Sequence, residues 1–306
     1  MLLPSLPMQP LAKARLQIHF CVLLWGFTAI LGKTIKLDAL SLVTWRMALV
    51  TGALLLVPRV WRSLRAMPLR LAGAYAGIGV LVAIHWLTFY ASIKLANASV
   101  GATCIALAPV FLSLVEPWVA RRPFNPRELL LGVAVVPGVA LVAGGVPAHM
   151  YEGIAAGVVS ALFCALFAAL NKRMVEHADP LTVTCLELGT GGVFLALFMP
   201  FFGFQIPTGH DATLLVLLAY GCTLLPFALA LVSLRHLTAF GVQMVTNLEP
   251  VYAIVLAVLL LGEQRELGVA FYAGVVVILS AVFAYPYLSR ETKPVPELIG
   301  TSETHG

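Results

Sequence analysis

The chain has 306 residues, of which 60% are hydrophobic and 11% are charged, with a formal net charge of +5. A soluble domain has about 45–50% apolar and about 25% charged residues, so this composition excludes a soluble domain and predicts an integral membrane protein. Because the basic residues lie in short loops between apolar runs, membrane topology explains the positive charge, and we expect no nucleic-acid partner.

Ten apolar runs are close to the roughly 20 residues that a helix needs to cross the hydrocarbon core. The predicted helices cover residues 17–33, 39–58, 71–93, 97–120, 128–146, 152–172, 180–201, 212–234, 237–261 and 266–288. The first run follows Lys13 and Arg15 like a signal peptide, but nine further runs follow it, so we interpret it as the first membrane helix. We therefore predict an all-α integral membrane fold of ten transmembrane helices, with no room for a soluble catalytic domain.

Two parts of the chain repeat each other. Residues 94–111 align with residues 235–252 at an offset of 141, and residues 29–33 align with 168–172 at an offset of 139. Five helices in each copy is an odd number, so the second copy must insert in the opposite orientation. Inverted repeats are typical of secondary transporters, which bind their substrate at the repeat interface near the middle of the membrane. The predicted domains are a cytoplasmic N-terminal segment 1–16, a first five-helix repeat 17–146, a second, inverted five-helix repeat 147–288 and a disordered cytoplasmic tail 289–306.

The distribution of lysine and arginine predicts the orientation. With the N-terminus in the cytoplasm, fourteen of the nineteen basic residues fall on the cytoplasmic side, four fall on the opposite side, and Arg46 lies within the membrane. The positive-inside rule therefore places both termini in the cytoplasm.

Neither the cysteines nor any short motif indicates enzyme or metal chemistry. The five cysteines lie singly inside apolar runs, without C-x-x-C spacing, and we interpret them as packing residues. No G-x-x-x-x-G-K-[ST], H-E-x-x-H or G-x-S-x-G motif occurs, and the three aspartates lie in or beside loops. We expect no catalytic residue, no metal and no cofactor. A membrane channel is the alternative function, and a membrane-embedded enzyme is a weaker one.

Several ionisable residues fall within the predicted helices, where a charge is costly and commonly functional. At about 1.5 Å per residue, Arg46, His85 and Glu249 share one layer, roughly 10 Å from the outer side. We expect Arg46 and Glu249 to pair at least part of the time, because an unpaired charge there would be costly. Glu187 is expected about 10 Å from the cytoplasmic face, and Glu116 near the cytoplasmic end of its helix, within reach of interfacial water. A structural role is the alternative for each of these residues.

Polar and aromatic side chains at helical spacing predict where the cavity lies. Gln243, Thr246 and Asn247 form a stripe in helix 237–261, which either lines a cavity or joins helices. Trp86 and Tyr90 share one face of helix 71–93, where they would either stack on a substrate or anchor the helix at the interface. The predicted cavity residues are Trp25, Arg46, His85, Trp86, Tyr90, Gln243, Asn247 and Glu249, and helix kinks are predicted at Pro109 and Pro250.

Short motifs in the chain resemble EamA-type proteins of the drug/metabolite transporter superfamily. Leu24-Trp25-Gly26-Phe27 followed by Lys33 resembles their first-helix signature, and Arg46 resembles the arginine often seen early in their second helix. Residues 248–252 with 259–263 resemble their ninth-helix pattern, whereas the first copy has Arg121-Arg122 where Gly-Glu would be usual.

The resemblance covers residues 17–288. It implies a secondary transporter or facilitator that exports small metabolites such as amino acids by alternating access. The partners are then a small-molecule substrate and the lipid bilayer of a bacterial inner (plasma) membrane. The protein would be a monomer or a homodimer.

Overall fold

The computed structural model describes residues 10–121, 123–265 and 267–288, and this part of the chain forms helices and their connections, without a strand. Six helical segments there are long and apolar enough to cross a membrane, or seven if a bent helix pair is counted as one crossing. Two further apolar helices are shorter. The all-helical membrane fold is confirmed, and the count of ten crossings stays a prediction. The expected tail 289–306 and the first nine residues lie outside the described residues.

In the first half of the chain, the first helix begins at Pro10, one to two turns before the predicted start at residue 17. The helices of this half are α1 (Pro10–Thr34), α2 (Ala39–Leu55), α3 (Pro58–Ala66), α4 (Leu69–Leu95), α5 (Ala98–Cys104), the 3-10 turn η1 (Ile105–Leu107), α6 (Ala108–Ala120), α7 (Pro126–Val133) and α8 (Val136–Gly144). α2 and α3 form the bent pair, with an angle of 93° between them.

The second half has the same order of long and broken helices. Its elements are the 3-10 turn η2 (Ala148–Met150), α9 (Tyr151–Met174), α10 (Pro180–Ala196), α11 (Met199–Phe202), α12 (Gly209–Ala219), the π-helical turn η3 (Tyr220–Leu224), α13 (Leu225–Leu234), α14 (Ala239–Thr246), α15 (Glu249–Leu261), the 3-10 turn η4 (Glu263–Arg265) and α16 (Val269–Leu288).

Helix starts recur at the repeat offset of 141. The side chain of Asp38 caps α2, and that of Asp179 caps α10 in the same way. Asn97 caps α5, and Thr238 caps α14. Each capping side chain accepts a hydrogen bond from a backbone N–H of the first turn, which otherwise has no partner within the helix. The repeat seen in the sequence therefore corresponds to equivalent helix starts in the structure.

The two helices that carry the predicted kinks are broken at equivalent places. The 3-10 turn η1 separates α5 from α6 directly before Ala108 and Pro109. In the second half, α14 ends at Thr246 and α15 begins at Glu249, one residue before Pro250. A proline has no N–H to donate and its ring crowds the preceding turn, which explains why both helices break there.

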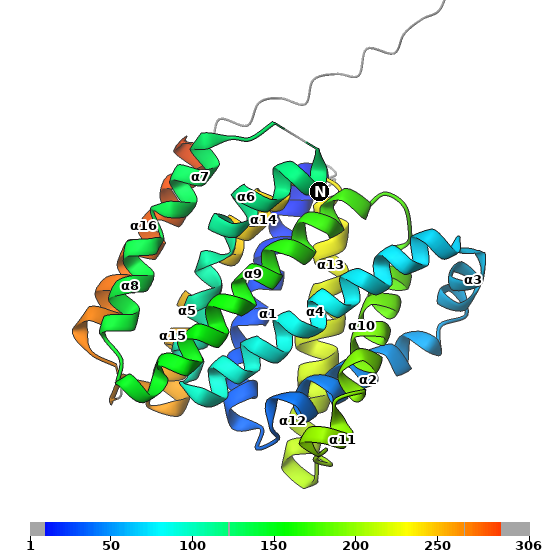
Figure 1. Ribbon diagram of the computed structural model, residues 1–306, viewed down its shortest axis with the longest axis horizontal. Coiled ribbons are helices and arrows are strands. Elements are labelled where there is room, and N and C mark those ends of the chain that lie inside the picture. The colour runs from blue at the N-terminus through cyan, green and yellow to red at the C-terminus, as the bar shows by residue number, and fades with distance from the viewer. Residues whose placement is uncertain (1–9, 122, 266, 289–306) are drawn as a thin grey trace, which may run out of the picture.

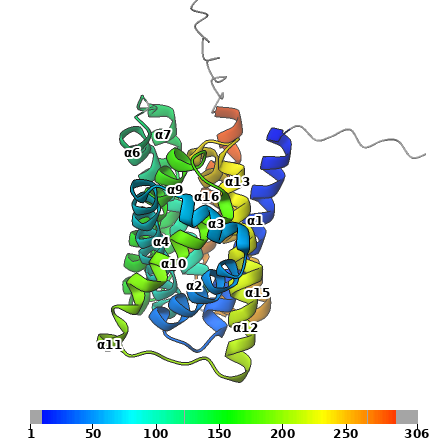
Figure 2. The same ribbon diagram turned by 90° about the vertical axis from the view of Figure 1, so that its right-hand side faces the viewer.

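The two halves run in opposite directions along the bundle. α1 ends beside the end of α4, because Lys33 Nζ donates to the Ala96 carbonyl at 3.2 Å. α9 begins at the same place, since a Cβ on Gly153 would lie 2.7 Å from the Ala96 Cβ. We call this the Lys33 end. The opposite end, where α1 begins and α16 finishes (Figure 2), is called the terminal end.

Equivalent basic residues bind backbone carbonyls at both ends. At the Lys33 end, Lys33 binds a carbonyl at the end of α4, and Lys94 binds one just after α1. At the terminal end, Lys172 binds a carbonyl at the end of α13, and Arg235 binds one just after α9. A helix leaves its last carbonyls without partners, and a cation is favoured there. These contacts join the first and third long helices of each half.

The centre of the bundle is packed very closely. α4 lies between α9 and α10 (Figure 1), and α4 and α10 touch through their backbones. A Cβ added to Gly79 would lie 2.2 Å from the Glu187 carbonyl, and one on Gly191 would lie 2.6 Å from the Gly79 carbonyl. α8 and α16 pack against each other at one edge of the molecule (Figure 1). The space between the two halves is therefore bounded by α1, α4, α9, α13 and α14.

Candidate functional site

A cavity that is partly open to the exterior lies between the two halves, and the empty space within it and at its mouth is about 870 Å³, open solvent included. The first half contributes α1, α2, α4 and the turn η1 to its wall, and the second half contributes α9, α13, α14 and α15. Its lining is Trp25, Thr28, Arg46, His85, Trp86, Phe89, Ile105, Cys164, Phe167, Ala168, Asn171, Phe227, Ala230, Leu231, Leu234, Ala239, Val242, Gln243, Thr246 and Glu249. The lining is mainly aromatic and aliphatic with a few polar groups, as is usual for small-molecule sites.

The cavity brings together six of the eight residues predicted to line it. These six are Trp25, Arg46, His85, Trp86, Gln243 and Glu249. Tyr90 and Asn247 are not part of the lining. The Tyr90 hydroxyl accepts a hydrogen bond from Arg46, and the Asn247 amide donates to the Ala106 carbonyl at 3.5 Å. Both residues lie behind the cavity wall and hold it together. Spacing along a helix predicts how far along the bundle a residue lies. It does not predict which neighbouring side chains separate that residue from the cavity.

Arg46 is buried at the cavity wall and is held by protein groups. Its Nε donates to Thr223 Oγ1 at 2.5 Å, its Nη1 to the Tyr90 hydroxyl at 2.9 Å, and its Nη2 to the Cys222 carbonyl at 3.5 Å. The guanidinium carbon lies 3.8 Å from the centroid of the Trp86 ring. A buried charge requires such partners, because it has lost its hydration.

The carbonyl that Arg46 binds is made available by a proline. Pro226 lies four residues after Cys222 and has no N–H to donate back to that carbonyl. The chain forms the π-helical turn η3 at this place. Sequence reasoning missed Thr223 and Cys222 as partners of Arg46, and the position of Pro226 could have indicated the carbonyl of Cys222 but not the hydroxyl of Thr223.

Glu249 faces the same cavity but does not pair with Arg46. Its side chain is 6% exposed, and in the described part of the chain it has no hydrogen bond and no ion pair closer than 4.0 Å. It is the first residue of α15, where the N-terminal end of the helix dipole favours a negative charge. The expected Arg46–Glu249 pair is therefore not formed in this structure, because the guanidinium is directed to α4 and η3.

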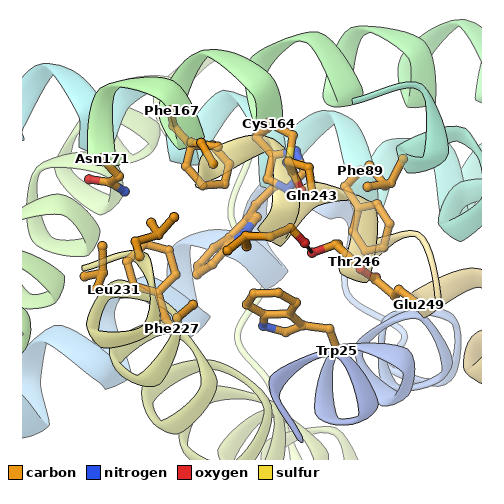
Figure 3. A pocket seen from close by; sticks show the side chains of 18 of the residues that line it. Trp25, Phe89, Cys164, Phe167, Asn171, Phe227, Leu231, Gln243, Thr246 and Glu249 are labelled. Atoms are coloured by element: carbon orange, nitrogen blue, oxygen red, sulfur yellow. Dashed lines mark hydrogen bonds between the residues drawn. The ribbon is translucent and has the colours of Figure 1, made fainter. Parts of the chain in front are cut away.

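Glu249 and Asn171 lie at opposite ends of the cavity. Figure 3 shows Thr246 and Glu249 together at one end, with Trp25 below them, and Asn171 at the other end. Aromatic rings, including those of Phe167 and Phe227, lie between the two ends (Figure 3). The cavity thus has an acidic end at Glu249 and an amide end at Asn171, with aromatic rings and the amide of Gln243 between them.

His85 is fixed by one serine of the second half. Its Nδ1 lies 2.9 Å from the Ser160 carbonyl, and the Ser160 hydroxyl donates to the His85 carbonyl at 2.9 Å. The ring also packs against Phe167, with centroids 5.3 Å apart. A backbone carbonyl can only accept, so Nδ1 carries the hydrogen in this arrangement. His85 joins α4 to α9 as well as lining the cavity.

Gln243 and Asn247 connect α14 to both halves. The Gln243 amide donates to Cys164 Sγ at 3.0 Å. Asn247 binds the carbonyl of Ala106, which is the residue 141 positions before it and so its own equivalent in the first half. Equivalent residues that touch each other must lie close to the axis that relates the repeats. The two helix breaks therefore meet at the centre of the molecule.

Two further acids are buried outside the cavity lining. Glu187 is fully buried on α10, outside the cavity lining, and accepts from the Asn171 amide at 3.3 Å. Glu116 is 3% exposed and buried within the bundle, rather than within reach of interfacial water. The remaining lining residues that the sequence did not single out are mostly aliphatic, three are phenylalanines, and one is the amide Asn171.

Comparison with protein families decides the identity of the chain. The family model of the EamA-like transporter family matches it twice, over residues 13–144 and 152–285. This chain belongs to the EamA-like transporter family. It is thus a multi-pass membrane transporter of the drug/metabolite transporter superfamily, as its motifs indicated.

Individual relatives of this EamA-like transporter agree with that assignment. It is 25% identical over 194 residues to an uncharacterized transporter, YxxF, of Bacillus subtilis (strain 168), covering 62% of each chain. It is 24% identical over 258 residues to an uncharacterized transporter of Clostridium kluyveri, covering 76% of this chain and 80% of that one. The match thus spans less than two thirds of the Bacillus protein. A solved structure, described as "Crystal structure of protein", shares the fold with a TM-score of 0.68 at 17% identity, over 92% of this chain and 99% of that one.

Proposed function

We propose that this EamA-like transporter exports small metabolites that carry an ammonium group, such as amino acids, by alternating access. The observation that supports this most strongly is the carboxylate of Glu249. It faces an aromatic cavity between the two halves and has no bonded partner among the described residues. A buried carboxylate of this kind favours a cation, because the pair then replaces the hydration that each charge has lost.

Aromatic rings beside Glu249 would also favour an ammonium group. The rings of Trp25, Trp86 and Phe89 line the same cavity. The face of an aromatic ring attracts a cation by about 0.5–2 kcal/mol, and the attraction is greatest where water is excluded. An apolar side chain of the substrate would then contact Phe167 and Phe227 in the middle of the cavity.

Arg46 would bind the carboxylate of an amino acid. Its three nitrogens each donate one described hydrogen bond, whereas a guanidinium has five N–H groups, so its two terminal nitrogens keep further donors. Arg46 and Glu249 both line the cavity without bonding to each other. A zwitterion placed between them would satisfy both charges.

We propose ten crossings, with both termini in the cytoplasm of a bacterial cell and the terminal end of the bundle facing inward. The two repeats would comprise residues 17–146 and 147–288, and the protein would act in the inner membrane as a monomer or a homodimer. The excess of basic residues in the loops of the terminal end supports this orientation. Hydrogen bonds from Lys33 and Lys94 join the helices at the opposite end, which favours a carrier over an open channel.

Counterflow in proteoliposomes tests this function. Liposomes loaded with each unlabelled amino acid in turn should take up the same labelled amino acid at equal pH on both sides. Glu249→Gln should abolish this uptake, while Glu152→Gln, an exposed acid at the start of α9, should not change it. Normal counterflow by Glu249→Gln would contradict the role of Glu249. Single-channel current in a planar bilayer would favour the channel instead.

A further inference from the structure

Glu187 is a second buried acid that the substrate site does not use. Its side chain has no exposed surface and lies on α10, outside the cavity lining. One carboxylate oxygen accepts from Asn171 Nδ2 at 3.3 Å, and the other has no hydrogen-bond partner. The amide oxygen of Asn171 is buried without a partner as well. Glu187 and Asn171 therefore each have one buried acceptor oxygen that receives no hydrogen bond.

Cationic groups near α10 are bound to other atoms. On α2, Arg46 donates to Thr223 and Tyr90. On α3, Arg59 forms an ion pair with Asp179 at 2.6 Å, at the start of α10. These cations leave the Glu187 carboxylate without an ionic partner on the side of α2 and α3.

In the described part of the chain, no basic group of the other neighbouring helices forms an ion pair with Glu187, although the Nε of Arg235 is buried without a hydrogen-bond partner. On α9, Lys172 donates to a carbonyl at the end of α13, and Arg235, which follows α13, donates to the Ala178 carbonyl. On α4, the Tyr75 hydroxyl donates to the Met174 carbonyl, and His85 is held by Ser160. An ionised carboxylate without a partner is costly in such a place, whereas a neutral carboxylic acid supplies the missing hydrogen.

The backbone of Glu187 packs closely against α4, and its side chain has no exposed surface. Gly79 of α4 approaches the backbone of Glu187 so closely that a Cβ would lie 2.2 Å from its carbonyl oxygen. Gly191, one turn further along α10, touches the same part of α4. The hydrogen-bond partner of the carboxyl group is Asn171, which also lines the cavity.

Glu187 occupies the place in the second half that Arg46 occupies in the first. The two positions differ by 141, the repeat offset, and Asn171 follows Gly32 by 139. Arg46 belongs to the cavity wall near α4 and η3, and Glu187 lies behind the amide end of the cavity, far from Glu249 (Figure 3). The two inverted halves thus place opposite charge types at equivalent positions on either side of one cavity.

We propose that Glu187 binds the proton that couples transport to a proton gradient, with Asn171 connecting it to the cavity. This inference rests on the proposed transport function. With the cavity open to the outside, the Glu187 carboxylate takes up one proton. With the cavity open to the cytoplasm, the acid releases that proton inside, so that one proton enters for each substrate molecule exported.

Two transport assays test the coupling with the full-length protein. The substrate is the amino acid that gives the strongest counterflow in the proteoliposomes described above. Glu187→Gln should keep counterflow at equal pH, because the amide resembles the neutral acid, but should lose accumulation driven by a pH gradient. A pH-sensitive dye trapped in the liposomes should report proton movement for the unaltered protein and none for Glu187→Gln. Glu176→Gln, an exposed acid beyond the end of α9, is the matched control and should behave like the unaltered protein. Accumulation driven by a pH gradient in Glu187→Gln would overturn the proposal.

An infrared titration of purified protein tests proton binding without any transport. The unaltered protein should show a carbonyl band of a buried carboxylic acid that disappears with rising pH and is missing in Glu187→Gln. Asn171→Ala should retain the band and shift the pH at which half of it has disappeared. This second variant keeps the test decisive if Glu187→Gln does not fold. A titration that shows no difference between Glu187→Gln and the unaltered protein would overturn the proposal. Absent counterflow in the unaltered protein would instead overturn the proposed function, and the infrared result would still decide on Glu187.

Discussion

Arg121 and Gly262 end α6 and α15 at equivalent positions, and both adopt the left-handed backbone conformation, with φ of 53° and 71°. They are 141 residues apart, the offset of the repeat. Arg121 is the one non-glycine residue with positive φ in the described part of the chain. The unusual Arg121-Arg122 pair of the first copy therefore puts a side chain where the backbone favours glycine.

Arg121→Gly should stabilise the protein. A non-glycine residue in this conformation costs about 1–3 kcal/mol, and the Arg121 side chain is exposed. The measurement is thermal unfolding in detergent, in which Arg121→Gly should unfold at a higher temperature. Gly262→Ala is the reciprocal control and should unfold at a lower temperature. A lower unfolding temperature for Arg121→Gly would show that its side chain outweighs the backbone strain.

Gly79→Ala should destabilise the contact between α4 and α10. The added methyl group would lie 2.2 Å from the Glu187 carbonyl, a backbone atom that cannot move without shifting the helix. We expect a lower unfolding temperature and a lower yield of folded protein. Gly77→Ala is the matched control, because a Cβ there meets no atom within 4 Å. Equal unfolding temperatures of the two variants would mean that α4 and α10 can move apart to admit the methyl group without a loss of stability.

Tyr90→Phe and Thr223→Val should each lower stability by about 1–3 kcal/mol, because each leaves a donor of the buried Arg46 guanidinium without its acceptor. Thermal unfolding of the purified variants measures the effect. Tyr151→Phe provides the control, since Tyr151 is 53% exposed. The prediction fails if Tyr90→Phe and Tyr151→Phe both unfold at the same temperature as the unaltered protein.

Glu263→Gln should loosen the Lys33 end. The Glu263 carboxylate accepts from Ala98 N at 3.0 Å, from Ser99 N at 3.1 Å and from Ser99 Oγ at 2.6 Å, and so fixes the start of α5. An amide accepts with only one oxygen, so Glu263→Gln loses part of this network. The buried Cys104 of α5 should then react faster with a water-soluble maleimide, as measured by mass spectrometry. Cys185 on α10 is the internal reference, and parallel acceleration of both would indicate general unfolding.

The sequence predicted the helices and the repeat because both depend on local composition and spacing. Asp38 and Asp179 mark equivalent helix starts that can be read directly from the chain. Contacts across the bundle were harder to predict, because counting along a helix gives the depth of a residue but not its direction. Arg46 and Glu249 do line one cavity, yet Arg46 is directed to Thr223 of a turn whose π-helical form has no simple sequence pattern.

The carboxylate of Glu263 has no acidic equivalent, since position 122, which precedes it by 141, is an arginine in the sequence. If the two halves were identical, the conformations open to either end would have equal free energies. The Glu263 carboxylate joins η4 of the second half to the start of α5 of the first half, so it removes this degeneracy, and we expect it to favour the conformation closed at the Lys33 end. The empty carrier should therefore rest mostly open toward the terminal end, and its apparent substrate affinity should differ between the two faces of the membrane. The net direction of flux is unaffected, because an asymmetric resting population cannot do work, and only the gradients across the membrane can.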